Sequence, residues 1–362
     1  MEQLPELDRG VAAAVTTGQQ TPRQVLWAGR DEQDDVLSLV AVAAPGTDGS
    51  AKWVRMTLIG VPERFAADTV TREGEAGRAW LARLPELVAE LCVRWGLRVT
   101  GDPMHGYLAL VVPALRGDVR CALKVSWVDG ETVNEAAALA LWNGAGAVRL
   151  LDADDTAGAL LLEWLDPRRR LAEADLSVAV PVAGRLLRRL AVPVPAEWPA
   201  RPVPGLRQWA VDLAAELRGL WRAAGRPFPG RQLDATVEVA TALAPHAGGL
   251  LANRDMHYQN VLAGDREPWL VIDPKVIRGD AEFGLAPLLW RRLGEAGGPA
   301  GLRRRFDALV DEAGLDAELA RGWTLLRAVD YQLWGLNLGL TEDPALCATV
   351  IDWLSLTAGQ RT

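Results

Sequence analysis

The fold of this chain is decided by one stretch, residues 253–275, which reads NRDMHYQNVLAGDREPWLVIDPK. Asp255 begins a D-x-H-x-x-N pattern in which His257 and Asn260 follow at fixed spacing. The apolar run WLVI then reads as a buried strand, and Asp273 comes directly after it. The whole stretch is therefore expected to form a polar hairpin between apolar strands.

This layout is typical of a phosphoryl-transfer site. Transfer from ATP requires a carboxylate beside the acceptor hydroxyl and oxygen ligands for Mg²⁺ near the phosphates, because positioning and charge neutralisation supply most of the catalysis. Asp255 and Asn260 have the spacing of the protein-kinase catalytic loop H-R-D-x-x-x-x-N, and Asp273 takes the place of the aspartate of D-F-G. We predict that Asp255 is the catalytic base and that Asn260 and Asp273 bind the metal. Any one of them alone is more simply an ordinary loop or strand-end residue.

The same stretch resembles the aminoglycoside phosphotransferases. Within them it is most similar to the branch of streptomycin 6-kinases and hydroxyurea phosphotransferases, in which I-D-P-K replaces the more usual I-D-x-G. The chain departs from the family at the front of the motif. Family members commonly read H-G-D-L-H, whereas this chain has Asn253, Arg254, Asp255, Met256 and His257, which leaves the base in place and changes the residues beside it.

The resemblance covers the chain from about Glu63 onward and implies an α+β, two-lobed protein-kinase-like fold. We expect a small β-rich lobe at residues 63–162 and a mainly helical lobe at 163–362 that carries the catalytic loop and the acceptor site. Residues 1–62 lie outside the resemblance and are expected to form a β-rich appendage. Its three short strands are predicted at Gln24–Ala28, Val36–Ala43 and Lys52–Gly60. Three β-rich runs argue against a disordered tail, and a cap over the acceptor pocket and a dimer contact both remain open.

Upstream of the motif, apolar residues repeat at helical spacing in residues 75–95, and Gly96 is expected to end this helix. Pro85 lies inside the pattern, so we expect a kink or break there. An acidic turn, DADD at residues 152–155, is expected between two apolar strands. Further amphipathic helices are predicted at Val178–Leu190, Leu206–Gly225 and Leu233–Leu243.

A phosphate-binding lysine is expected in the small lobe. Residues 107–114 and 119–127 read as two strands, and Lys124 lies in the second between apolar neighbours. A helix with Glu135 near its start follows. In kinases this arrangement lets the strand lysine pair with the helix glutamate and hold the α- and β-phosphates. The alternative is a lysine on a solvated strand face.

The resemblance also implies a hinge between the lobes, whose backbone groups meet the adenine edge of the nucleotide. By position, Glu163 and Leu165 supply these groups, although an edge strand leading to the next helix is an equal alternative. No G-x-G-x-x-G precedes the strands, so only backbone amides near 104–106 are available for phosphate there. A P-loop transferase is disfavoured because the chain has no G-x-x-x-x-G-K-[ST].

Composition restricts the remaining possibilities. With 362 residues and 49% apolar side chains the chain can bury a sizeable core, and its net charge of −8 argues against a nucleic-acid surface while suiting a cationic ligand or plain solubility. Three cysteines far apart make a disulfide framework or zinc site unexpected and favour a reducing cytoplasm. An acidic amino terminus and the lack of a long apolar run predict no targeting segment and no membrane span.

The predicted function is that of an ATP- and Mg²⁺-dependent kinase of a small, cationic hydroxyl compound, such as a streptomycin-type aminoglycoside or an amino sugar, in antibiotic resistance or secondary metabolism. A hydroxyurea-type acceptor is the alternative, and a catalytically silent kinase-like binding protein is the rival from another class. The residues proposed to contact the acceptor are His257, Asp280, Glu282 and Asp330. Lys275 is expected either to act with Lys124 on the phosphates or to pair structurally with a carboxylate such as Asp255 or Asp280.

Overall fold

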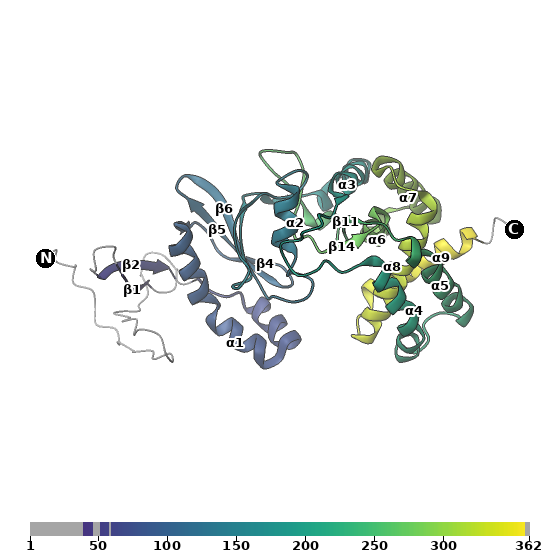
Figure 1. The fold of residues 1–362 in the computed structure, drawn as a ribbon, viewed down its shortest axis with the longest axis horizontal. Helices are drawn as coiled ribbons and strands as arrows, with labels where there is room; N and C mark the ends of the chain where they lie inside the picture. The colour runs from purple at the N-terminus through teal and green to yellow at the C-terminus, as the bar shows by residue number, and fades with distance from the viewer. Residues whose placement is uncertain (1–38, 46–50, 58, 359–362) are drawn as a thin grey trace. The chain divides into compact units, whose positions relative to one another are not determined.

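The computed structural model describes residues 39–45, 51–57 and 59–358 (Figure 1). The expected strand at Gln24–Ala28 lies outside these residues, as do the first residues of the expected strand at Val36–Ala43. The chain divides into two compact units, Met1–Trp127 with Leu151–Trp164, and Val128–Leu150 with Leu165–Thr362. Residues 128–150, which the predicted boundaries place in the small lobe, therefore group with the second unit.

The first unit contains a hairpin and a larger sheet. Strands β1 (Leu39–Pro45) and β2 (Ala51–Thr57) pair antiparallel with each other, at two of the three places where strands were predicted. The larger sheet runs in the order β3-β5-β6-β8-β7, with β4 paired to β5. Its strands are β3 (Leu97–Val99), β4 (Met104–His105), β5 (Ala109–Arg116), β6 (Val119–Ser126), β7 (Leu150–Asp154) and β8 (Ala159–Glu163).

The predicted acidic turn at residues 152–155 is wrong in its first part. Strand β7 extends to Asp154, and the carboxylates of Asp152 and Asp154 form ion pairs with Arg116 and Arg94. Because these arginines neutralise the aspartates, the strand continues through residues that resemble a turn in the sequence.

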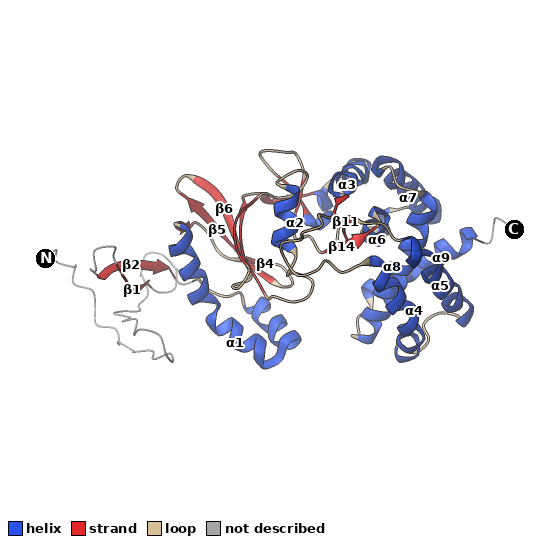
Figure 2. Cartoon of the chain, in the orientation of Figure 1, coloured by secondary structure: helices blue, strands red, loops and turns tan. Residues whose placement is uncertain are grey.

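Helix α1 (Glu63–Trp95) packs its apolar face on this sheet, where Leu84, Val88 and Leu91 are fully buried (Figure 2). The helix ends as predicted, because Gly96 adopts a left-handed conformation and its amide bonds to the last turn. The predicted break at Pro85 is wrong. The backbone leaves helical geometry at Gly74 instead, with φ 61° and ψ −133°, which glycine adopts without steric cost.

The second unit is mainly helical, and its predicted helices at Val178–Leu190, Leu206–Gly225 and Leu233–Leu243 are confirmed as α3, α4 and α5. The helices are α2 (Glu135–Trp142), α3 (Leu176–Leu190), α4 (Leu206–Ala223), α5 (Gly230–Leu243), α6 (Ala286–Trp290), α7 (Pro299–Ala313), α8 (Ala317–Asn337) and α9 (Glu342–Ala358). Trp323 of α8 is buried in the core, whereas Trp334 of the same helix is 43% exposed.

Two small sheets lie among these helices and hold the motif. One has the order β10 (Val192–Pro193), β11 (Leu250–Asn253), β14 (Val276–Gly279), and the other has the order β13 (Leu270–Val271), β12 (Val261–Ala263), β9 (Asp166–Arg170). The chain passes from β11 to β12 through residues 254–260 and from β13 to β14 through residues 272–275. The strand predicted from the WLVI run is confirmed but short, since only two of its residues pair.

The described residues include no helix that is long and apolar enough to cross a membrane. All three cysteines are free thiols. Burial, with a further contribution from Cys121, raises the pKa of the Cys92 thiol to about 11. Because the thiolate is the reactive form, Cys92 is protonated and unreactive at neutral pH.

Candidate active site

The loop at residues 254–260 and the turn at residues 272–275 are joined by backbone hydrogen bonds at both ends. The amide of Arg254 donates to the carbonyl of Lys275 at 2.8 Å, and the amide of Ile272 donates to the carbonyl of Asn260 at 2.8 Å. Asp255 and Asp273, far apart in the sequence, are therefore carried by two backbone segments that lie side by side.

Asn253 locks this arrangement and was missed as a functional residue by the sequence analysis. Its side chain is buried, and its Oδ1 accepts hydrogen bonds from the amides of Asp255 at 3.1 Å and Lys275 at 3.3 Å. One side-chain oxygen thus fixes the start of the loop and the end of the turn. The sequence signal for Asn253 was its position at the front of the motif, where this chain departs from the family pattern.

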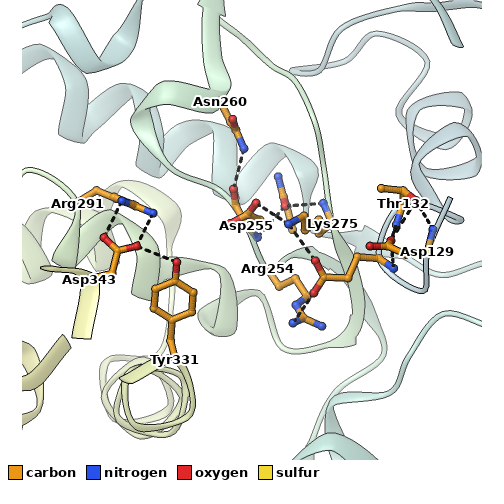
Figure 3. Close-up of polar contacts among 11 residues, drawn as sticks. Asp129, Thr132, Arg254, Asp255, Asn260, Lys275, Arg291, Tyr331 and Asp343 are labelled. Carbon is orange, nitrogen blue, oxygen red and sulfur yellow. Dashed lines mark hydrogen bonds and ion pairs between the residues drawn. The ribbon is translucent and has the colours of Figure 1, made fainter. Parts of the chain in front are cut away.

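The carboxylate of Asp255 lies beside the ammonium of Lys275, with Oδ2 and Nζ 3.5 Å apart (Figure 3). Lys275 makes a closer ion pair with Glu131, at 2.9 Å, and the other Glu131 oxygen contacts Arg254 at 3.2 Å. The contacting side chains are alternately basic and acidic, from Arg254 through Glu131 and Lys275 to Asp255. Glu131 was not among the predicted residues, because nothing in the sequence links position 131 to the motif.

The charged side chains in this set of contacts shift one another's pKa values. Burial opposes the positive charge of Lys275, but Asp255 and Glu131 outweigh it and raise the pKa of the ammonium. Burial likewise opposes the charge of Glu131, but Lys275 and Arg254 lower the pKa of its carboxyl below the usual value. Lys275 and Glu131 are therefore both charged at neutral pH.

The residues predicted to bind metal supply hard oxygen atoms. Asn260 donates from Nδ2 to the backbone carbonyl of Asp255 at 3.3 Å, which orients its amide group. Asp273 is half-buried and has a φ of 51°, in the left-handed region, although the next residue is Pro274. An aspartate in this conformation is strained by about 1–3 kcal/mol, and strain of this kind concentrates at functional sites.

The described residues contain no cluster of three or more histidine, cysteine, aspartate or glutamate side chains that could hold a metal ion alone. Mg²⁺ does not need one, because it is usually bound by one or two carboxylates together with substrate phosphates and water. The donor set of Asn260 and Asp273 fits an ion that arrives with a nucleotide.

His257 follows Asp255 on the same loop, and its Nδ1 is a buried atom with no hydrogen-bond partner among the described residues. Burial lowers the pKa of the imidazole, against an opposing effect of Asp255. The ring is therefore neutral at physiological pH. Its predicted contact with an acceptor remains a prediction.

The residues predicted to contact the nucleotide divide between the two units. Lys124, in β6 of the first unit, is only 5% exposed, so the alternative of a solvated strand face is wrong. Glu135 begins α2 in the second unit and is 3% exposed. Glu163 is the last residue of β8, and Leu165 is buried just beyond the point where the chain enters the second unit.

Asp280 is held by the protein itself. Its Oδ1 accepts from the amide of Gly248 at 2.7 Å, and its Oδ2 accepts from the indole of Trp323 at 2.8 Å. The expected structural pair between Lys275 and Asp280 is wrong, since the lysine pairs with Glu131 and Asp255. Both Asp280 oxygens stabilise the fold around α8.

The other two acidic candidates are also engaged. Glu282 accepts from the amide of Asp316 at 3.0 Å, just before α8, and Asp330 forms an ion pair with Arg327 at 2.9 Å. Neither contact involves a part of the catalytic loop. The sequence showed their charge but not these partners.

A second ion pair near the loop was also missed. Arg291 donates two hydrogen bonds to Asp343, at 3.0 and 3.2 Å, and the hydroxyl of Tyr331 donates to the same carboxylate at 3.0 Å (Figure 3). The Tyr331 ring stacks between Trp290 and Trp334, with centroids 5.3 and 5.2 Å away. This network joins α8 and α9 next to the loop.

Comparison with known proteins gives close relatives. Residues 94–339 match the family described as aminoglycoside/hydroxyurea antibiotic resistance kinase. The chain is 41% identical over 318 residues to hydroxyurea phosphotransferase of Kitasatospora aureofaciens, which covers 85% of this chain and 90% of the relative. It is 40% identical over 294 residues to streptomycin 6-kinase of Streptomyces griseus, with 78% and 93% covered.

Solved structures resemble this one in fold. A thermostable mutant of aminoglycoside phosphotransferase APH(4)-Ia superposes with a TM-score of 0.52 at 14% identity, covering 75% of this chain and 99% of the other. Choline kinase LicA from Streptococcus pneumoniae gives a TM-score of 0.52 at 11% identity, covering 76% and 99%. At such identities the likeness concerns the fold alone, and it confirms the predicted α+β protein-kinase-like class.

Proposed function

The chain belongs to the aminoglycoside/hydroxyurea antibiotic resistance kinase family, and from this premise we propose how its residues perform the reaction. It is a phosphotransferase that acts on hydroxyl groups. The proposed reaction transfers the γ-phosphoryl group of ATP to a hydroxyl of an aminoglycoside-like acceptor. The observation that carries the proposal is the fixed backbone arrangement that brings Asp255, Asn260 and Asp273 together.

Asp255 accepts or orients the proton of the acceptor hydroxyl. Its amide is fixed by Asn253, while its carboxylate forms an ion pair with the side-chain ammonium of Lys275. A carboxylate on a rigid backbone is suited to this role, because general-base catalysis depends first on position and then on pKa.

Asn260 and Asp273 would hold Mg²⁺ when the nucleotide is bound, and the ion would supply charge neutralisation for the transferring group. Lys124 binds the α- and β-phosphates, and Glu135 pairs with it, as in other kinase-like enzymes. The Lys124 side chain is only 5% exposed, which supports a role for it in the site over a place on a solvated strand face. Glu163 and Leu165 meet the adenine edge with backbone groups.

Lys275 stabilises negative charge on the transferring phosphoryl group from its place beside Asp255. The turn that carries it follows the metal-binding aspartate directly, so its ammonium lies in the region where phosphate charge gathers. His257 presents a neutral imidazole on the same loop and contacts the acceptor.

The acceptor is a small molecule with a hydroxyl group, of the streptomycin type or, as the alternative, of the hydroxyurea type. These are the compounds named for the relatives. Asp280, Glu282 and Asp330 can contribute to a cationic acceptor only by exchanging their present partners. The protein acts in the cytoplasm, where ATP is available, in resistance or in secondary metabolism.

The rival from another class is a catalytically silent binding protein, and turnover separates the two. The experiment measures ADP release by the full chain with Mg·ATP and a panel of aminoglycosides, amino sugars and hydroxyurea. Acceptor-dependent ADP release is expected with at least one compound, together with a product heavier by one phosphoryl group. Mg·ATP binding without ADP release for every acceptor would support the silent protein.

A further inference from the structure

We propose that Glu131 is a positioning residue that keeps the Lys275 ammonium from closing on the Asp255 carboxylate. The proposal rests on the function proposed above, because it assigns Lys275 and Asp255 to the reaction. Glu131 contacts neither substrate in this account and acts through Lys275. Glu131 precedes the stretch that carries Asp255 and Lys275 by more than a hundred residues.

The first support is the division of the ammonium between two carboxylates. Lys275 Nζ lies 2.9 Å from Glu131 and 3.5 Å from Asp255. The contact with Glu131 has the length of a charge-assisted hydrogen bond, and the contact with Asp255 is longer than the usual range for such a bond. Without the Glu131 charge, Asp255 is the carboxylate that remains in an ion pair with the ammonium, and Asp273 adds a further attraction. A tight pair with Asp255 would occupy the oxygen that is to receive the hydroxyl proton.

The second support is the use of both Glu131 oxygens. Oε2 contacts Lys275, and Oε1 contacts Arg254 at 3.2 Å. Arg254 and Lys275 are also joined through their backbones, since the Arg254 amide donates to the Lys275 carbonyl. Glu131 therefore binds two cations that the backbone already holds together, which fixes its carboxylate in one place beside the base.

The third support is the turn that carries Glu131 (Figure 3). Asp129 Oδ1 accepts from the amides of Glu131 at 2.8 Å and Thr132 at 2.9 Å, and from the Thr132 hydroxyl at 3.1 Å. The Asp129 amide in turn donates to that hydroxyl at 3.0 Å. These bonds give the short segment a defined backbone, so that the carboxylate does not follow a freely moving loop.

Any test of Glu131 must separate position from stability. Its side chain is 39% exposed, but its partners Lys275 and Arg254 are only 21% and 20% exposed, so removing its charge should also lower stability. Arg185 and Glu312 form an ion pair outside the loop, at 3.1 Å, with a glutamate of similar exposure, 36%, and an arginine that is 58% exposed. Glu312→Gln is therefore a matched control for Glu131→Gln, because both changes remove one charge from a half-exposed carboxylate and keep the side-chain shape.

The kinetic test uses Glu131→Gln, Lys275→Met and the double variant, with the acceptor found by the panel. Glu131→Gln should lower kcat by about 10-fold, as for other residues that orient a reacting group, while KM for ATP changes little. The double variant should turn over as Lys275→Met does, because Glu131 acts through the lysine. Glu312→Gln should behave as the wild type. Losses that multiply in the double variant, or an unchanged kcat in Glu131→Gln, would overturn the proposal.

A second test needs no turnover, so it still decides the proposal when no acceptor is found and the proposed function fails. The chain has only three lysines, Lys52, Lys124 and Lys275. Acetylation by acetic anhydride is followed by mass spectrometry, with the Lys52 peptide as internal standard. Glu131→Gln should change the labelling rate of Lys275 severalfold and Glu312→Gln should not, at unchanged circular dichroism. Equal rates in both variants would show that Glu131 does not hold the lysine.

Discussion

Two acidic residues of the second unit, Asp255 and Asp280, differ in what holds them in place. In Asp255 the main chain is fixed by Asn253, while the carboxylate faces a lysine side chain at 3.5 Å. In Asp280 the carboxylate itself is used by the fold, with one oxygen bonded to a backbone amide and the other to the indole of Trp323. The comparison teaches that a carboxylate is available for chemistry when the backbone, and not its own oxygens, holds it in place.

The largest effect that tests this comparison is expected from Asp255→Asn. The amide keeps the shape of the side chain but cannot accept the hydroxyl proton, so kcat should fall by roughly 10²-fold or more. Mg·ATP binding, measured by calorimetry, should be retained because the metal ligands are untouched. Unchanged acceptor phosphorylation by this variant would remove Asp255 from the mechanism.

Asp273→Ala should weaken Mg²⁺-dependent nucleotide binding by on the order of 10-fold or more, since Asn260 alone supplies one protein oxygen to the ion. Titration with ATP in the presence and absence of Mg²⁺ measures the difference. The variant should lose the metal dependence of binding. Its thermal stability is measured beside the binding, because alanine tolerates a φ of 51° less well than aspartate and the change should also lower stability. Normal Mg·ATP affinity would contradict the assignment of Asp273 as a ligand.

The sequence was sufficient for the parts of the site that follow from local spacing. Asp255, Asn260 and Asp273 lie in one stretch, and the kinase pattern predicted both the fold class and their proximity. The phosphate-binding role predicted for Lys124 rested on its position relative to Glu135 and the catalytic stretch, and its burial argues against the solvated alternative.

The remaining contacts depend on which distant segments the fold brings together. Glu131 precedes Lys275 by more than a hundred residues, and no local pattern indicates that it lies against the motif. The partner of Asp280 is Trp323, on a helix that the sequence placed only in general terms. Pro85 shows a different limit, since a residue that disfavours helix is tolerated where the surrounding packing holds the helix together.

Asn253→Ala tests whether the backbone holds the catalytic residues. The change leaves the amides of Asp255 and Lys275 without their acceptor, and should destabilise the protein by about 1–3 kcal/mol. Turnover should fall as well, because both side chains lose their fixed backbone. Urea unfolding and steady-state kinetics measure the two effects. Asn337→Ala is the control, since the Asn337 amide donates to the carbonyls of Leu220 in α4 and Leu333 in α8, outside the loop. Full activity in a destabilised Asn253→Ala variant would show that the loop does not depend on this side chain.

The smallest effect on turnover is expected from Asp280→Asn. This change tests whether a carboxylate whose oxygens are bonded to the fold is unavailable for the reaction. Asparagine has the same shape, but its Nδ2 cannot accept from Gly248 or Trp323, so one of the two bonds is lost and the free energy of unfolding should fall by about 1 kcal/mol. Because the carboxylate is used by the fold, kcat and the KM of a cationic acceptor should stay within about twofold of the wild type, a change below 1 kcal/mol. Urea unfolding and steady-state kinetics on the same preparation separate the two. A normal unfolding curve combined with a KM raised 10-fold or more would place Asp280 in the acceptor site. It would contradict the distinction drawn between Asp255 and Asp280.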